Sequence, residues 1–212
     1  MSQTHYNSIA FLHIPKTAGS TLQQIIRRNY KSDEGMIYEK KRMAAFLGLS
    51  EKQRKKVKIL MGHFSFGLNV HQYLSQPTTY FTILRNPVDR VISTYFYIIR
   101  NPDHTHYKAT LDLSLYDFVK NGVSPVGIDN GMTRLLCGID DTASIPFGGC
   151  TGAMLQMAKN NLAQYFSVIG FTDRFDETLI LLKKIYGWRI FYIKENVSKN
   201  RSAAPPPLKL ST

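Results

Sequence analysis

Residues 11–22 read Phe-Leu-His-Ile-Pro-Lys-Thr-Ala-Gly-Ser-Thr-Leu, and this stretch decides the fold of the chain. An apolar run up to Ile14 enters a short turn, and a helical pattern with Leu22, Ile25 and Ile26 on one face follows. This order predicts a strand, a tight loop and a helix. Unpaired N–H groups at a helix N-terminus attract anions, so the loop is a candidate anion site. The residues that could contribute to it are Lys16, Thr17, Ala18, Gly19, Ser20 and Thr21.

This loop differs from the phosphate loop of nucleoside triphosphatases. That loop has the pattern G-x-x-x-x-G-K-[ST], with the lysine near its end. Here Lys16 opens the loop, and Gly19 is the only glycine in it. Ser20 and Thr21 stand where N-cap residues are expected. An ordinary capped loop is therefore the alternative to an anion site.

A second strand-to-helix junction lies in residues 79–96. The β-rich run 79–84 precedes Arg-Asn-Pro-Val-Asp-Arg, and Pro87 suits the first turn of a helix. Arg85 ends the strand and Ser93 lies about two turns into the helix, so a guanidinium and a hydroxyl could reach a second anion. The alternative is a structural Arg85 that pairs with Asp89.

Together the two junctions resemble motifs that bind 3′-phosphoadenosine 5′-phosphosulfate (PAPS). Residues 15–21 are similar to the 5′-phosphosulfate loop of sulfotransferases, and residues 84–93 resemble their 3′-phosphate motif. The likeness is closest to sulfotransferase family 2, which includes the uronosyl 2-O-sulfotransferases and many bacterial homologues. Weaker likeness in 62–66, 130–134 and 169–176 extends it over residues 8–202.

The resemblance implies an enzyme that transfers a sulfuryl group from PAPS to an acceptor hydroxyl, leaving adenosine 3′,5′-bisphosphate (PAP), without a metal. Lys16 would stabilise the leaving group. The N–H groups of residues 17–21 would hold the 5′-phosphate, and Arg85 and Ser93 the 3′-phosphate. Arg201 lies where the family has a basic segment that closes over the nucleotide.

His63 is the predicted base of this reaction. In the uronosyl enzymes a histidine in a similar context removes the acceptor proton, and His63 follows an apolar run that ends in Gly62. Imidazole titrates near neutral pH, which suits proton transfer. The alternative is a core histidine bonded to a backbone carbonyl.

The acceptor side of the site is predicted from a helical pattern at 127–137. Asn130, Thr133 and Arg134 could line the cleft, where Arg134 would suit an acidic sugar, but an ordinary amphipathic surface helix explains them as well. We expect a hydroxylated glycan as acceptor; a lipid or a small metabolite stays open.

Short β runs separated by helices predict an α/β fold: three layers, with a mostly parallel sheet of about five strands and helices on both faces. Ligands of such sheets bind beyond the carboxyl ends of the strands, where Lys16, His63 and Arg85 would converge. The predicted strands are 8–14, 57–62, 79–84, 166–170 and 189–193. The predicted helices are 20–30, 40–56 (in one or two pieces), 88–100, 113–121, 127–137, 151–164 and 174–186.

Length and composition suit a single enzyme domain, which the resemblance implies is a sulfotransferase domain at residues 1–202, followed by a proline-rich tail at 203–212. The 212 residues are 43% hydrophobic and 20% charged, as in ordinary globular proteins. No apolar run approaches the ~20 residues of a membrane span, and the N-terminus is unlike a signal peptide, so we expect a cytoplasmic protein. Cys137 and Cys150 lack metal-ligand spacing and are expected as thiols, although a bridge between them stays open.

The net charge of +12 calls for an anionic partner. A nucleic acid would explain the charge, but no RNA-binding motif or zinc finger is present. A polyanionic cosubstrate with an acidic acceptor explains it equally well, so we expect no nucleic-acid partner. Two rival functions remain: a nucleotide kinase or triphosphatase that uses the same loop, and a basic binding module.

Overall fold

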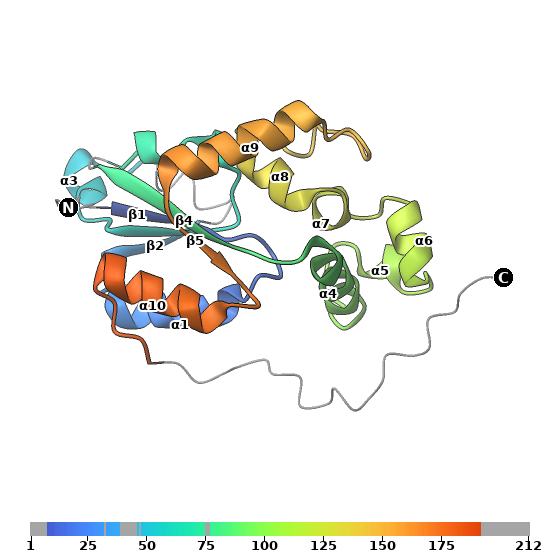
Figure 1. Cartoon of the computed structure of the whole chain (residues 1–212), viewed down its shortest axis with the longest axis horizontal. Helices are drawn as coiled ribbons and strands as arrows, with labels where there is room; N and C mark the ends of the chain where they lie inside the picture. The colour runs from blue at the N-terminus through green and yellow to red at the C-terminus, as the bar shows by residue number, and fades with distance from the viewer. Residues whose placement is uncertain (1–7, 32, 39–45, 47, 75–76, 192–212) are drawn as a thin grey trace.

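A five-stranded parallel sheet forms the centre of the computed structural model (Figure 1). The structure describes residues 8–31, 33–38, 46, 48–74 and 77–191. The strands lie in the order β2-β3-β1-β4-β5. Their bounds are Ser8–Leu12 (β1), Gly35–Tyr38 (β2), Ile59–Gly62 (β3), Thr78–Leu84 (β4) and Phe166–Phe171 (β5). The predicted α/β class with a parallel sheet is confirmed.

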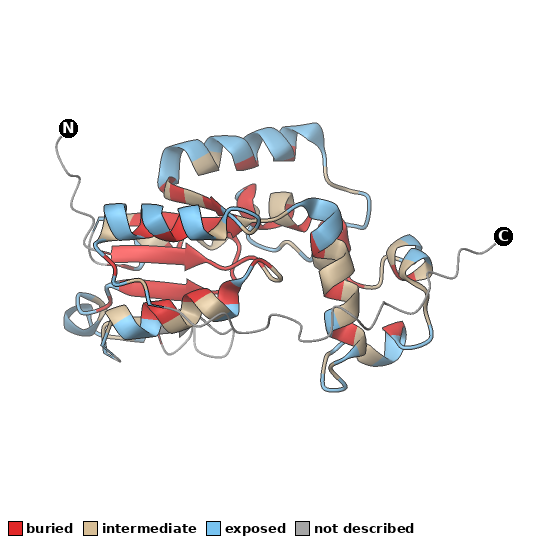
Figure 2. Cartoon of the chain, turned by 60° about the horizontal axis from the view of Figure 1, so that its bottom comes forward, coloured by how far each residue is buried: buried red, intermediate tan, exposed pale blue. Residues whose placement is uncertain are grey.

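Helices cover both faces of this sheet, because β1 is apolar on both of its sides. Ile9 and Phe11 pack with helices α1 (Gly19–Asn29) and α10 (Phe175–Tyr186), whereas Ala10 and Leu12 pack with α8 (Gly131–Leu136) and α9 (Gly152–Tyr165). Figure 1 shows α1 and α10 below the sheet and α9 above it. The buried strands lie between helices whose outer sides are exposed (Figure 2).

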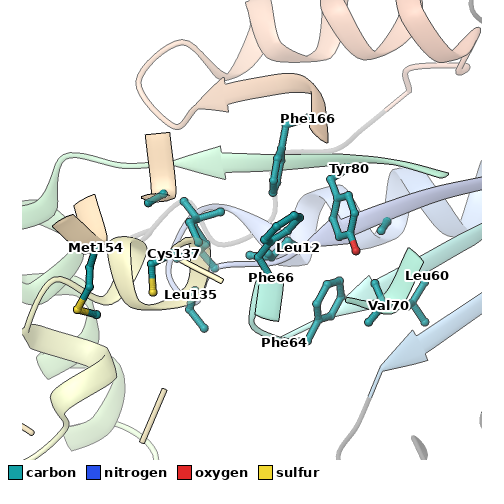
Figure 3. Close-up of a cluster of buried hydrophobic side chains, with 14 of the residues drawn as sticks. Leu12, Leu60, Phe64, Phe66, Val70, Tyr80, Leu135, Cys137, Met154 and Phe166 are labelled. Carbon is teal, nitrogen blue, oxygen red and sulfur yellow. The ribbon is translucent and has the colours of Figure 1, made fainter. Parts of the chain in front are cut away.

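The core on the α8–α9 side is rich in aromatic rings. Phe66 packs edge-on against Tyr80, with the ring centroids 5.1 Å apart, and lies 5.8 Å from the ring of Phe166 (Figure 3). Cys137 is buried in the same cluster, and both Cys137 and Cys150 are free thiols. The bridge that the sequence left open is therefore not formed.

Helix α4 (Pro87–Ile99) and three short helices lie beyond the carboxyl ends of the strands, on the right of Figure 1. The three short helices are α5 (Tyr107–Thr110), α6 (Leu115–Lys120) and α7 (Pro125–Ile128). The small core of this group contains Ile98, Phe118 and Ile128. Helix α3 (Glu51–Arg54) and the 3-10 turns η1 (Phe66–Leu68) and η2 (Val70–Gln72) complete the described elements.

Three sequence predictions of elements need correction. The predicted strand 189–193 is irregular at 189–191, because Arg189 forms its backbone hydrogen bonds with the side chain of Asn29; residues 192–193 lie outside the described residues. The predicted helix 127–137 is two helices, separated at Asn130, which is left-handed with φ 50°. The edge strand β2 was not predicted. Residues 40–45 and 47 of the predicted helix 40–56 lie outside the described residues, as does the tail 203–212.

The strand register places the site. Leu12 at the end of β1 is level with Gly62 at the end of β3, and the N–H of His13 donates to the carbonyl of Gly62 at 2.9 Å. On the other side β1 pairs with β4, which ends just before Arg85. After β1 the chain continues toward β2 at one edge of the sheet, and after β4 it continues toward β5 at the other edge. The strand order thus reverses between β1 and β4, and ligands of open α/β sheets bind just outside this switch point. Within the described part of the chain, no helix is both long and apolar enough to cross a membrane.

Candidate active site

The loop after β1 has an unusual backbone for a segment that contains only one glycine. Lys16 and Ala18 are both left-handed, with φ of 69° and 63°, and neither is glycine. Thr17 between them is buried, and its hydroxyl donates to the carbonyl of Ile14 at 2.7 Å. The hydroxyl thus holds the turn, which leaves the backbone N–H of Thr17 as its contribution to an anion site. Alternating backbone conformations of this kind turn successive N–H groups toward one point.

Helix α1 begins without a side-chain cap. Its N-cap is Ala18, and Ser20 and Thr21 lie inside the first turn, so the expectation that the two hydroxyls cap the helix is wrong. The first N–H groups of a helix have no partner within it. Here no side chain replaces that partner, and the positive end of the helix dipole lies at the same place. This end of α1 has the properties of an anion-binding helix terminus.

Gly19 is required by the ring of His13. A Cβ atom at position 19 would lie 1.7 Å from Nε2 of His13, far closer than atoms can approach. The His13 ring is 7% exposed and stacks on Phe11, with ring centroids 5.3 Å apart. Burial, followed by the neighbouring His63 and Lys16, lowers the pKa of His13 to about 3. His13 is therefore a neutral structural ring between the loop and the next strand.

His63 follows β3 and is oriented by the backbone of His13. Its Nδ1 lies 2.8 Å from the carbonyl oxygen of His13. A carbonyl can only accept, so Nδ1 carries the proton and Nε2 presents a free lone pair. The two imidazole rings lie 4.2 Å apart, and His63 is solvent-exposed. Desolvation of the ring by the surrounding protein lowers the pKa of His63, and the hydrogen bond to the carbonyl of His13 opposes this in part. His63 is thus neutral and able to accept a proton at neutral pH.

Arg85 links the end of β4 to the loop after β1. Its Nη1 donates to the carbonyl of Lys16 at 3.0 Å. The alternative ion pair between Arg85 and Asp89 is not among the ion pairs of the described residues. The Lys16 ammonium lies 3.9 Å above the ring of Tyr97 on α4. Burial, and then Arg85, lowers the pKa of Lys16.

Helix α4 begins as the sequence predicts. Asn86 is its N-cap, accepting from the N–H groups of Val88 and Asp89, and Pro87 occupies the first turn. Ser93 is half-buried and lies one turn before Tyr97, so the two share a face of the helix. That face is the one that approaches Lys16.

The predicted role of Arg134 in acceptor binding is wrong. Arg134 is fully buried, forms an ion pair with Asp129, and donates to the backbone carbonyls of Asp129, Ile145 and Pro146. It therefore braces the segment after α8 and presents nothing to an acceptor. The pattern Asn-Gly-Met-Thr-Arg could not reveal this, because a helical arginine is usually exposed.

Asn130 and Thr133 line a cavity of about 600 Å³ between α4, α6, α7 and α8. Asn130 donates to Asp129 Oδ1 at 2.8 Å. Most of the cavity wall is apolar, formed by side chains such as Val91, Ile92 and Val119. Arg201, the last predicted site residue, lies outside the described residues.

Comparison with known proteins identifies the family. The sequence model of the sulfotransferase family matches residues 1–123, more than half of the chain, so this protein belongs to the sulfotransferase family, a class of enzymes. The chain matches no curated protein.

A sulfotransferase of known structure has a similar fold. A sulfotransferase from Alicyclobacillus acidocaldarius superposes with a TM-score of 0.50 at 12% identity, over 94% of this chain and 88% of that one. Mouse sulfotransferase SULT7A1, solved with PAP, gives a TM-score of 0.48 at 13% identity over 87% of this chain. The present chain covers 59% of the length of the mouse protein.

The contact between His13 and Gly19 predicts strongly coupled substitutions. Gly19→Ala should destabilise the protein by about 1–3 kcal/mol, because the new methyl group overlaps the imidazole ring. In a His13→Ala background the same change should cost much less. Urea unfolding of the two single variants and the double variant measures the coupling. Additive losses would show that His13 is not what excludes a side chain at position 19.

The buried His13 also predicts a pH dependence of stability. The pKa of His13 is near 6.5 in the unfolded chain and about 3 in the folded one. Below pH 6.5 the unfolded chain therefore binds more protons, and the free energy of unfolding decreases as the pH is lowered. From about pH 7.5 to about pH 5, His13 should remove up to about 2 kcal/mol of unfolding free energy. His13→Phe should lose correspondingly less over this range in urea titrations. An equal loss in both proteins would contradict the neutral, buried state of His13.

Proposed function

We propose that this sulfotransferase moves a sulfuryl group from PAPS to the hydroxyl of an acceptor, with His63 as the base and Lys16 stabilising the leaving group. One observation carries the proposal: residues that follow three neighbouring strands meet at one edge of the sheet. Arg85 donates to the backbone of Lys16, and His63 Nδ1 donates to the carbonyl of His13. The chemistry-bearing groups are thus linked through the loop itself.

The donor groups at this edge fit the two phosphate positions of PAPS. The uncapped N-terminus of α1 and the N–H groups from Thr17 to Thr21 suit the 5′-phosphate. Arg85 donates through Nη1 to the carbonyl of Lys16, and its other N–H groups can donate to the 3′-phosphate. We also assign Ser93 to the 3′-phosphate. Among the described residues, no cluster of three or more His, Cys, Asp or Glu side chains is arranged to hold a metal ion.

The proposed chemistry needs a proton acceptor and a cation. PAPS supplies the sulfuryl group and a bisphosphate leaving group. His63 Nε2, free because Nδ1 is engaged, takes the proton from the acceptor hydroxyl. The Lys16 ammonium offsets the negative charge that develops on the leaving oxygen, and such charge stabilisation in a fixed site is a major source of rate acceleration.

A hydroxylated acceptor is all that the proposal requires. The burial of Arg134 removes the argument for an acidic sugar at that position, although a glycan stays our proposed acceptor because of the net charge of +12. Asn130 and Thr133 remain proposed acceptor contacts, since both line the cavity beside α4.

The nucleotide preference tests the cosubstrate. At 100 times its dissociation constant, PAP should add about 2.7 kcal/mol of stability, which is about 5–10 °C in melting temperature for this size. Arg85→Met should reduce the shift strongly, whereas Arg27→Met, an exposed arginine on α1, should leave it unchanged. A larger shift with ATP and Mg²⁺ than with PAP would instead support a kinase or triphosphatase.

The roles of His63 and Lys16 can be separated kinetically. His63→Ala should leave PAP affinity nearly intact and lower turnover by about 10²–10⁴-fold, as expected for a general base. Lys16→Ala should lower turnover and also weaken PAPS binding. Sulfuryl transfer to a panel of hydroxyl acceptors and calorimetric titration with PAP measure the two effects. Near-normal turnover of a folded His63→Ala variant would overturn the base assignment.

A further inference from the structure

Lys16 is held at both ends by groups from distant segments. Its backbone carbonyl accepts from Arg85, which follows β4, and its ammonium lies 3.9 Å above the ring of Tyr97 near the end of α4. A lysine has a long flexible side chain, and an exposed ammonium samples many positions. The contact with Tyr97 restricts this sampling at the tip of the side chain.

Tyr97 is itself held in place by its neighbours. Asn101 Nδ2 donates to the hydroxyl of Tyr97 at 3.3 Å. The ring of His104 packs edge-on against the Tyr97 ring with centroids 5.6 Å apart. His104 is fixed in turn, since its Nδ1 accepts from the N–H of His106 at 3.1 Å. The aromatic face below Lys16 is therefore part of a packed cluster, although Tyr97 is 44% exposed.

The surroundings of Lys16 otherwise disfavour its charge. Burial and the Arg85 guanidinium lower the pKa of Lys16. Two histidines also face its charge: the pKa values of His13, after β1, and of His104, after α4, are both lowered in part by Lys16. Within the described part of the chain, no carboxylate forms an ion pair with Lys16. The π face of Tyr97 favours the ammonium, through the negative potential of an aromatic face.

We propose that Tyr97 is a positioning residue for Lys16, holding the ammonium charged and at the mouth of the loop where the leaving group is stabilised. The inference rests on the proposed function, because it assigns Tyr97 a part in the chemistry of Lys16. Neither the loop after β1 nor the nucleotide contacts proposed above include Tyr97. Its specific requirement is an aromatic face; the hydroxyl points to Asn101 and is dispensable for Lys16.

The first measurement needs neither nucleotide nor acceptor. The rate at which an amine-reactive reagent modifies Lys16 is followed against pH by peptide mass spectrometry, which yields the pKa of its ammonium. In Tyr97→Leu this pKa should fall by about half a unit to one and a half units, whereas Tyr97→Phe should match the unaltered protein. Tyr116→Leu is the matched control, because Tyr116 lies beneath Lys120 at 5.6 Å on α6. It should leave the Lys16 profile unchanged.

The second measurement separates kcat from KM. Tyr97→Leu should lower kcat for sulfuryl transfer by about 3–30-fold with KM for PAPS little changed, and Tyr97→Phe should restore kcat. An unchanged Lys16 pH profile in Tyr97→Leu, or a changed profile with unchanged kcat, overturns the positioning role. If the profile moves as expected but the unaltered protein transfers no sulfuryl group to any acceptor, the proposed function fails while the contact with Tyr97 stands.

Discussion

The ring of His13 seated on the backbone of Gly19 is the contact on which the site depends. It fixes where α1 begins relative to β1, because only a residue without a side chain lets the ring reach the loop. The backbone carbonyl of His13 also accepts a hydrogen bond from His63. His13 therefore sets both the start of the anion-binding helix and the tautomer of the proposed base. Both effects follow from a residue that carries no charge of its own at neutral pH.

Positive charges near this contact outnumber the negative charges that could neutralise them. Arg85 lies close enough to Lys16 to lower the pKa of its ammonium, and Asp129, the buried acid near the cavity, is already paired with Arg134. The edge of the sheet therefore holds positive charge and uncapped N–H groups without an internal counter-ion among these residues. Binding an anion relieves this imbalance, which a fold selected for stability alone would avoid.

The sequence predicted the parts of the site that depend on strand ends and missed those that depend on packing. The apolar runs before Lys16, His63 and Arg85 were sufficient to predict three parallel strands, and parallel strands bring their ends together. The short edge strand β2 has no long apolar run in the sequence, so only its pairing with β3 in the structure identifies it as a strand. Arg134, a cation expected at the acceptor, is instead buried and braces the fold. Tyr97, an aromatic residue in an apolar helix pattern, instead contacts Lys16. Periodicity cannot separate these outcomes, because it reports the face of a helix and not what lies opposite.

The left-handed backbone at Lys16 and Ala18 has a consequence for how the loop meets a ligand. Glycine-rich phosphate loops owe their shape to residues that have many conformations, and ordering such residues costs entropy. Here two non-glycine residues adopt a sparsely populated conformation, and the neighbours that hold them, Arg85 and Thr17, belong to the fold. The free-energy cost of this backbone strain is offset during folding by the packing of the whole domain. A ligand then finds the loop already shaped and loses little affinity to ordering it.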